Sequence, residues 1–256
     1  MIILLFACLF LLATLTAMIA YKLKNLSIID ISWALGPLLV TFLFYILYGE
    51  TFSQLLFSIL LSLWSLRLIF FLFFTRFLKG FKDKRYTQIQ QKWSSSSFFY
   101  TLRHFYFQLC FQSVLCLPSL LVYLKTFDIK PLYYVGISSL FFLSLGLQHL
   151  SDYQLYCFKQ SKQEGICRIG LWNYSRHPNY FFEFLIWLTL SILAYLICKI
   201  IYVFLTPLIV FIILRVMTGP YTERLSVNKH GDTYIKYQKE VPMFFLNIYQ
   251  LLKGKK

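Results

Sequence analysis

Hydrophobic residues along this chain fall into blocks of about twenty, separated by short polar and basic segments. One block of this length is enough for an α-helix to cross the hydrocarbon core of a bilayer. The first block lacks a basic leader and is interpreted as a retained span, not as a cleaved signal peptide. The pattern predicts an all-α, polytopic transmembrane helical bundle of about seven spans: residues 2–21, 31–49, 53–75, 103–124, 132–157, 178–197 and 201–218.

The basic residues predict the orientation of this bundle. Of the 25 Lys and Arg residues, 21 lie on alternate loops and in the C-terminal tail, whereas the opposite loops carry only Lys125, Lys130 and Lys199. Because loops rich in Lys and Arg stay in the cytoplasm, we expect the N-terminus outside and the C-terminus in the cytoplasm. The orientation of the loops in the membrane therefore accounts for the net charge of +15. No nucleic-acid partner is predicted.

The composition indicates the class of protein and the kinds of site it can contain. The chain is 59% hydrophobic and 20% aromatic, which is typical of an integral membrane protein of a bacterial inner membrane or an endoplasmic reticulum. Without an internal repeat or a long linker, residues 1–256 are interpreted as a single membrane domain, with residues 219–256 as a cytoplasmic tail of short interfacial helices. The six cysteines and four histidines show no metal-ligand spacing, so no metal is predicted. Because no Gly-rich nucleotide motif is present, any nucleotide needs a non-Rossmann site.

Polar residues crowd into the segment 165–187, directly before and inside a hydrophobic block. Pro178 fits the first turn of a helix, where its missing N–H costs nothing. The preceding residues would then meet the positive end of the helix dipole, which binds phosphates readily, and Arg176 would strengthen that site. Asn179 and Glu183 share one helix face, and a carboxylate at membrane depth indicates a functional site. The polar members of this segment are Arg168, Arg176, His177, Asn179 and Glu183.

Other polar residues lie where a purely structural span does not need them. At helical spacing, His149, Asp152, Tyr156 and Lys159 make one stripe at the end of span five. The carboxylate of Asp152 either binds a nucleotide or pairs with Lys159 or Arg176, and the residues leave both readings open.

Two further segments carry candidate functional residues. Asp83, Arg85 and Tyr86 lie on a predicted interfacial helix, where Tyr86 is placed to offer a hydroxyl to a substrate. In the tail, a helix carrying Glu223 is followed by a turn at Gly231 and a second helix. These tail helices either anchor the chain at the interface or act as a lid over a cofactor. The tyrosines of the second helix are Tyr234 and Tyr237.

The sequence GLWNYSRHPNYFFE, from Gly170 to Glu183, resembles the signature of the membrane steroid 5-alpha-reductase-like family, in particular its DUF1295 branch. The resemblance covers roughly residues 28–245. It extends to the motifs of Asp30 with Trp33, Trp64 with Arg67, Asp83 with Tyr86, and Ser151 to Leu155.

This resemblance implies an enzyme, an NADPH-dependent oxidoreductase acting on a CH–CH group. Its cofactor would lie inside the helix bundle at the cytoplasmic side, and it would reduce a carbon–carbon double bond of a sterol, steroid, polyprenoid or enoyl lipid. The motifs do not assign the catalytic acid, and the candidate catalytic residues are Tyr86, as the acid, and Glu183. The resemblance places eight residues at the cofactor site, and Arg168 and Glu223 are added as further candidates. The candidate cofactor-binding residues are therefore Asp152, Arg168, Arg176, His177, Asn179, Tyr180, Glu183, Glu223, Tyr234 and Tyr237.

Two departures and two alternatives accompany the resemblance. Phe182 stands where the family usually has Gly, and Lys82 stands where an acid commonly precedes Asp83. Isoprenylcysteine and phospholipid methyltransferases, which bind S-adenosylmethionine, share the R-H-P-x-Y helix start, but the Asp30, Trp64 and Asp83 motifs favour a reductase. A non-enzymatic scaffold is the third reading, and the intact cluster from Arg176 to Glu183 argues against it.

Overall fold

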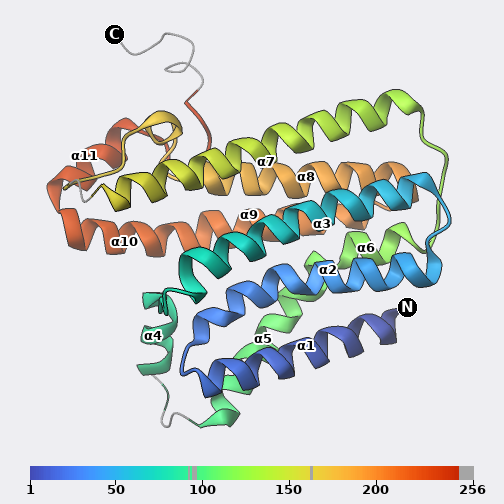
Figure 1. Cartoon of the computed structure of the whole chain (residues 1–256). Coiled ribbons are helices and arrows are strands. Elements are labelled where there is room, and N and C mark those ends of the chain that lie inside the picture. Colours follow the sequence, from blue (N-terminus) through green and yellow to red (C-terminus); the bar gives the residue numbers. More distant parts are fainter. Residues whose placement is uncertain (92, 94–96, 162–163, 248–256) are drawn as a thin grey trace. The chain divides into compact units, whose positions relative to one another are not determined.

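A computed structural model describes residues 1–91, 93, 97–161 and 164–247 (Figure 1). Across these residues the chain is helical and contains no strand, which confirms the predicted all-α class. The α-helices are α1 (Ile2–Lys22), α2 (Ile29–Tyr48), α3 (Phe52–Leu72), α4 (Lys84–Gln91), α5 (Phe98–Leu115), α6 (Leu117–Val122), α7 (Pro131–Gln160), α8 (Pro178–Cys198), α9 (Leu205–Ile212), α10 (Gly219–His230) and α11 (Asp232–Glu240). Shorter turns are η1 (Leu26–Ile28), η2 (Phe73–Phe77), η3 (Gly170–Asn173), η4 (Ile201–Phe204) and η5 (Ile213–Thr218).

Six helical stretches in the described part of the chain are long and apolar enough to cross a membrane. The protein is therefore an integral, multi-pass membrane protein. These stretches correspond to six of the seven predicted spans, although several extend beyond the predicted ends. They are Ile2–Lys22, Leu26–Tyr48, Phe52–Phe77, Pro131–Gln160, Pro178–Cys198 and Ile201–His230.

The predicted span 103–124 is not one continuous helix. It is divided between α5 and α6, and the break falls at Cys116, two residues before Pro118. A proline has no N–H, and its ring excludes the carbonyl four residues earlier from the helical ladder. That carbonyl belongs to Val114, and it accepts a hydrogen bond of 2.7 Å from the Thr206 hydroxyl. The break is therefore compensated by a polar contact from another part of the chain.

The helices form two compact units. Unit 1 contains residues 1–131 and 190–206, and unit 2 contains residues 132–189 and 207–256, of which the structure describes the part up to residue 247. The chain passes from unit 2 to unit 1 within α8 and returns within α9.

Unit 1 has its core where α1 packs against α5 and α2, and where α2 packs against α3. Ala13, Ala17 and Ala20 supply small side chains that let α1 come close to Phe105 of α5. Buried hydrogen bonds between helices add to this packing, because unpaired polar groups are costly at membrane depth. Examples are Thr41 to Ser119 at 2.5 Å and Gln112 to Ser32 at 3.1 Å.

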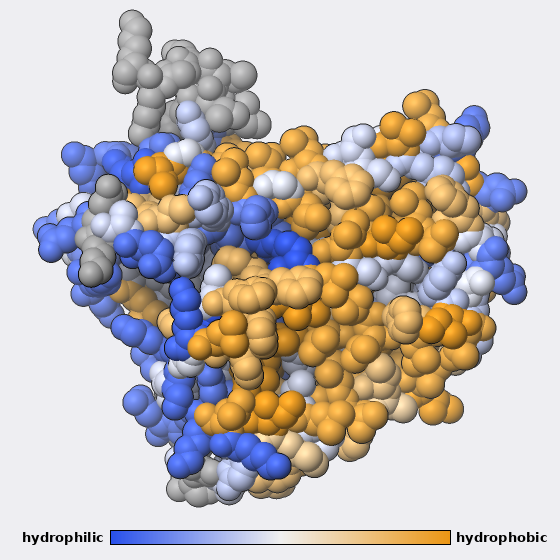
Figure 2. All heavy atoms as spheres, viewed as in Figure 1, coloured by the Kyte–Doolittle hydropathy of each residue, from blue (hydrophilic) through white to orange (hydrophobic). Residues whose placement is uncertain are grey.

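Large hydrophobic side chains also cover much of the outside of unit 1. Figure 2 shows hydrophobic residues over the visible faces of α1 and α2, and hydrophilic residues gathered around α4. Exposed hydrophobic residues of α1 and α2 include Phe6, Phe10, Phe42 and Ile46. Such a face in water would be a liability, whereas in a bilayer it meets acyl chains.

Candidate functional site

The loop before α8 is fixed onto α7 by two hydrogen bonds. The Leu171 N–H donates to Gln154 Oε1 at 3.1 Å, and the Trp172 indole N–H donates to the Ser151 carbonyl at 3.0 Å. Gly170 has a φ of +52°, and a Cβ at this position would collide with the Gln154 side chain. The loop then leads into Pro178, which begins α8 as predicted.

Arg176 lies at the head of α8 and is buried. Its Nε donates to Glu223 Oε1 at 2.6 Å, and its Nη2 donates to Glu223 Oε2 at 3.1 Å. Its Nη1 donates to the carbonyls of Gln238 and Val241, at 2.8 and 2.5 Å. The guanidinium therefore holds α10 and the end of α11 against the head of α8, a role that the sequence did not reveal.

His177 shares the same carboxylate. Its Nε2 lies 3.2 Å from Glu223 Oε1, and its ring stacks on Tyr180 with centroids 4.8 Å apart. Burial lowers the pKa of His177, and the positive charges of Arg176 and Arg215 act in the same direction, while Glu223 opposes them. The neutral imidazole is consequently the form that fits this site.

The lowered pKa of His177 predicts that the protein is less stable at acid pH. His177 binds a proton more weakly in the folded than in the unfolded state, where the pKa is about 6.5. Its contribution to stability is therefore complete above that value and is lost as the pH falls through the folded pKa. We expect the melting temperature of the detergent-purified protein to fall between about pH 7 and pH 5, and His177→Asn to reduce that fall.

The control for this measurement is His149→Asn, which removes an exposed histidine from α7. It should keep the full acid response. If His177→Asn and His149→Asn show the same dependence of melting temperature on pH, His177 does not set the acid stability.

The two tail tyrosines are buried beneath the loop. The Tyr237 hydroxyl donates to the Trp172 carbonyl at 2.5 Å, and Arg168 lies over the Tyr237 ring at 4.7 Å. Arg168 also pairs with Glu240. Burial raises the pKa of Tyr234 to about 12, so its phenol stays protonated at neutral pH. Both tyrosines pack α11 against the loop, and the turn between the tail helices falls at Gly231, as predicted.

A second polar group in unit 2 joins α7 to α8. Asn179 Nδ2 donates to Asp152 Oδ1 at 3.1 Å, and Gln148 Nε2 donates to Glu183 Oε2. Glu183 Oε1 also accepts from the indole N–H of Trp187 at 3.0 Å. Each helix contributes residues four apart, so the pairs form two successive rungs between the helices. We call Gln148, Asp152, Asn179 and Glu183 the polar ladder.

Two oxygens of the polar ladder have no hydrogen-bond partner in the described structure. These are Gln148 Oε1 and Asn179 Oδ1, and both are buried. The amide orientations are determined by the carboxylates, because each NH₂ must face the acceptor of its rung. The two oxygens are thus left as acceptors without donors, a state that costs about 1–3 kcal/mol for each group. Such a pair indicates a site for a ligand that carries N–H or O–H donors.

The sequence missed Gln148, although its spacing of four from Asp152 was a usable signal. The residues of the polar stripe predicted on α7 differ in their burial. Asp152 is half-buried and faces α8, whereas His149, Tyr156 and Lys159 are exposed. For Asp152, the readings left open were nucleotide binding and pairing with Lys159 or Arg176. Arg176 pairs with Glu223 instead, and nucleotide binding by Asp152 stays a prediction.

Tyr86 lies in a different cluster, within unit 1. Its hydroxyl donates to Asp30 Oδ1 at 2.5 Å. Arg76 and Arg85 pair with Asp30 at 2.5 and 3.4 Å, and Arg85 also pairs with Asp83 at 2.8 Å. These contacts tie α4 to the start of α2 and bring together the predicted Asp30 and Asp83 motifs.

The charges in this unit 1 cluster shift its pKa values. Burial alone would raise the pKa of Asp83, but the hydrogen bonds and charge of Arg85 outweigh burial and lower it. Burial and the Asp30 carboxylate raise the pKa of Tyr86 well above its usual value, so the phenol stays protonated. The role of Tyr86 as an acid stays a prediction.

Comparison with known families gives one match. The family model described as "Protein of unknown function (DUF1295)" matches residues 17–241, which includes α2 to α11 and most of the polar residues described above. Neither the curated proteins nor the solved structures include a match to this chain.

Proposed function

The protein belongs to the DUF1295 family, and we propose that it is an NADPH-dependent membrane reductase that acts on a carbon–carbon double bond of a lipid. The observation that carries this proposal is the pair of buried acceptors, Gln148 Oε1 and Asn179 Oδ1. A nicotinamide has a carboxamide NH₂ with two donors, which matches these oxygens in number and kind. The residues present therefore fit the group.

The polar ladder would hold the nicotinamide end of the cofactor. Gln148 and Asn179 would accept hydrogen bonds from the carboxamide, while Glu183 and Asp152 hold the two side-chain amides in the orientation that leaves their oxygens free. When bound, NADPH supplies the hydride for the reduction. Because the ladder lies between membrane-spanning helices, the acceptor that reaches it is a lipid such as a sterol, polyprenoid or enoyl lipid.

The phosphates require cations near the head of α8. Arg168 is 38% exposed at its side chain, so its guanidinium is accessible despite its pair with Glu240. Arg215 is exposed and acts electrostatically on His177. These two arginines are better placed to receive phosphates than Arg176, whose donors face protein acceptors. The membrane proposed is a bacterial inner membrane or an endoplasmic reticulum, with this end of unit 2 in the cytoplasm.

A methyltransferase is the second candidate, and one feature of the ladder favours it. Asp152 and Glu183 place two carboxylates beside the free acceptors. This arrangement also suits the ammonium and sulfonium groups of S-adenosylmethionine, because a cation is stabilised by nearby carboxylates.

The test is thermal stabilisation of the detergent-purified protein by NADPH, NADH and S-adenosylmethionine, measured in parallel. A ligand at a hundred times its dissociation constant adds about 2.7 kcal/mol to stability, which a melting curve resolves. We expect NADPH to give the largest shift. A shift with S-adenosylmethionine alone would replace the reductase by the methyltransferase, and no shift with any of the three would contradict both enzymes.

A further inference from the structure

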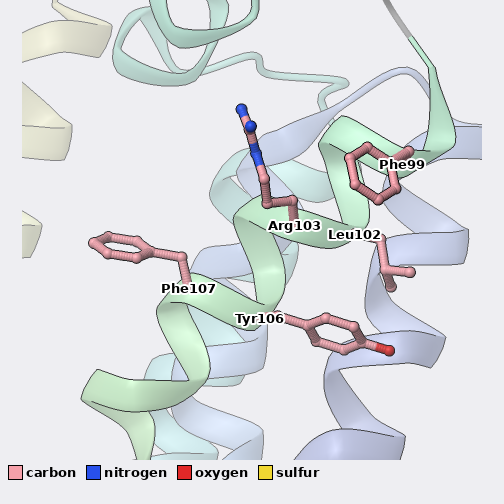
Figure 3. Close-up of a pocket in the computed structure, with 5 residues that line it drawn as sticks. All are labelled: Phe99, Leu102, Arg103, Tyr106 and Phe107. Atoms are coloured by element: carbon pink, nitrogen blue, oxygen red, sulfur yellow. The ribbon is translucent and has the colours of Figure 1, made fainter.

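An open apolar groove runs along α5 in unit 1 (Figure 3). Its volume is about 390 Å³, within the range of small-molecule sites, which is roughly 300–1,000 Å³. Phe99 and Phe107 are 67% and 60% exposed, and Figure 3 shows them one turn before and one turn after Arg103. The lining residues are Phe99, Leu102, Arg103, Tyr106 and Phe107.

One side of the groove is held in place by α1. The Tyr106 hydroxyl forms a hydrogen bond of 3.0 Å with Thr14, and the Tyr106 ring stacks on Phe10 with centroids 4.9 Å apart. These contacts fix the tyrosine against the neighbouring helix. The groove is therefore a preformed surface.

Arg103 gives the groove one charged point. Its guanidinium lies 4.9 Å from the centre of the Tyr100 ring, and it pairs with no carboxylate among the residues that the structure describes. Tyr100 stacks with Trp93, with ring centroids 5.9 Å apart. Trp and Tyr gather where a membrane meets water, so this end of α5 is at the level of the lipid headgroups.

We propose that this groove binds an anionic phospholipid, with the phosphate on Arg103 and one acyl chain along Tyr106 and Phe107, which follow Arg103 on α5. The apolar walls suit a long hydrocarbon chain. Arg103 pairs with no carboxylate in the described part of the chain, so its charge attracts an anion at headgroup level. A phospholipid from the surrounding bilayer supplies both in one molecule. This site lies wholly within unit 1 and does not depend on the proposed reductase activity.

Native mass spectrometry of the full-length protein in detergent tests the proposal. The protein is titrated with dioleoyl phosphatidylglycerol or with dioleoyl phosphatidylcholine, and the dissociation constant of the first bound lipid is measured. We expect tighter binding of phosphatidylglycerol, and Arg103→Gln should weaken it about fivefold while changing phosphatidylcholine little. Phe107→Ala should weaken the binding of both lipids, because it removes an apolar wall.

Two control variants separate this site from unspecific charge effects. Arg103→Lys keeps the cation and should keep most of the preference for phosphatidylglycerol. Arg224→Gln removes an equal charge from an exposed position on α10 and should change nothing. Equal affinities of the wild type for the two lipids would overturn the proposal, and so would equal losses in Arg103→Gln and Arg224→Gln.

Discussion

Glu223→Ala is expected to lower the free energy of unfolding by about 3–5 kcal/mol, because it leaves the buried Arg176 guanidinium without its carboxylate. Both side chains are only 9% exposed, and two of the hydrogen bonds of Arg176 end on Glu223. His177 and Gln238 lose the same partner. Melting curves would show the loss of stability, and hydrogen exchange should show it first in α10 and α11.

A surface pair in the same unit provides the matched control. Arg168 and Glu240 are 38% and 41% exposed, so their attraction is screened by water. Arg168→Gln should therefore cost at most about 1 kcal/mol. If Glu223→Ala costs no more than Arg168→Gln, the Arg176–Glu223 pair does not hold the tail to the head of α8.

Features that depend on local sequence were predicted well. Six spans follow from blocks of hydrophobic residues, and the start of α8 follows from Pro178, because both depend on residues that are neighbours in the chain. The prediction of one continuous span over residues 103–124 was wrong, because a hydropathy pattern does not register the proline that breaks the helix. Pro118 interrupts the helix, and the Thr206 hydroxyl that compensates the break comes from a segment far along the chain.

In the candidate site, too, local features were predicted and contacts between distant segments were not. The motif residues Asp152, Asn179 and Glu183 do meet in the polar ladder, and the spacing of Asn179 and Glu183 on one helix face was predicted. Pairings between distant segments were not. Arg176 was expected to bind phosphate, and its partner Glu223 lies 47 positions later in the chain. Gln148 was overlooked because a glutamine carries no charge to mark it in a hydrophobic span.

The second large effect is expected from Asn179→Leu, which tests whether the free acceptors bind the cofactor. Leucine has nearly the shape of asparagine but accepts no hydrogen bond, so a carboxamide donor of NADPH would be left unpaired. We expect the dissociation constant for NADPH to rise by roughly five- to a hundredfold, which corresponds to about 1–3 kcal/mol. Binding is measured by the shift of the melting temperature over a range of NADPH concentrations. Glu183→Gln should act in the same direction, because it disturbs the rung that orients Gln148.

The stability of the ligand-free protein distinguishes a binding role from a structural one. Asn179→Leu removes a buried acceptor that has no partner, and Asp152 remains half-buried, where water can replace the lost amide. The ligand-free melting temperature should therefore change little or rise, because removing an unsatisfied group offsets the lost hydrogen bond. Asn228→Leu, at an exposed position on α10, is the matched control and should leave NADPH affinity unchanged. A large loss of ligand-free stability in Asn179→Leu, with unchanged affinity for NADPH, would mean that the polar ladder only joins α7 to α8.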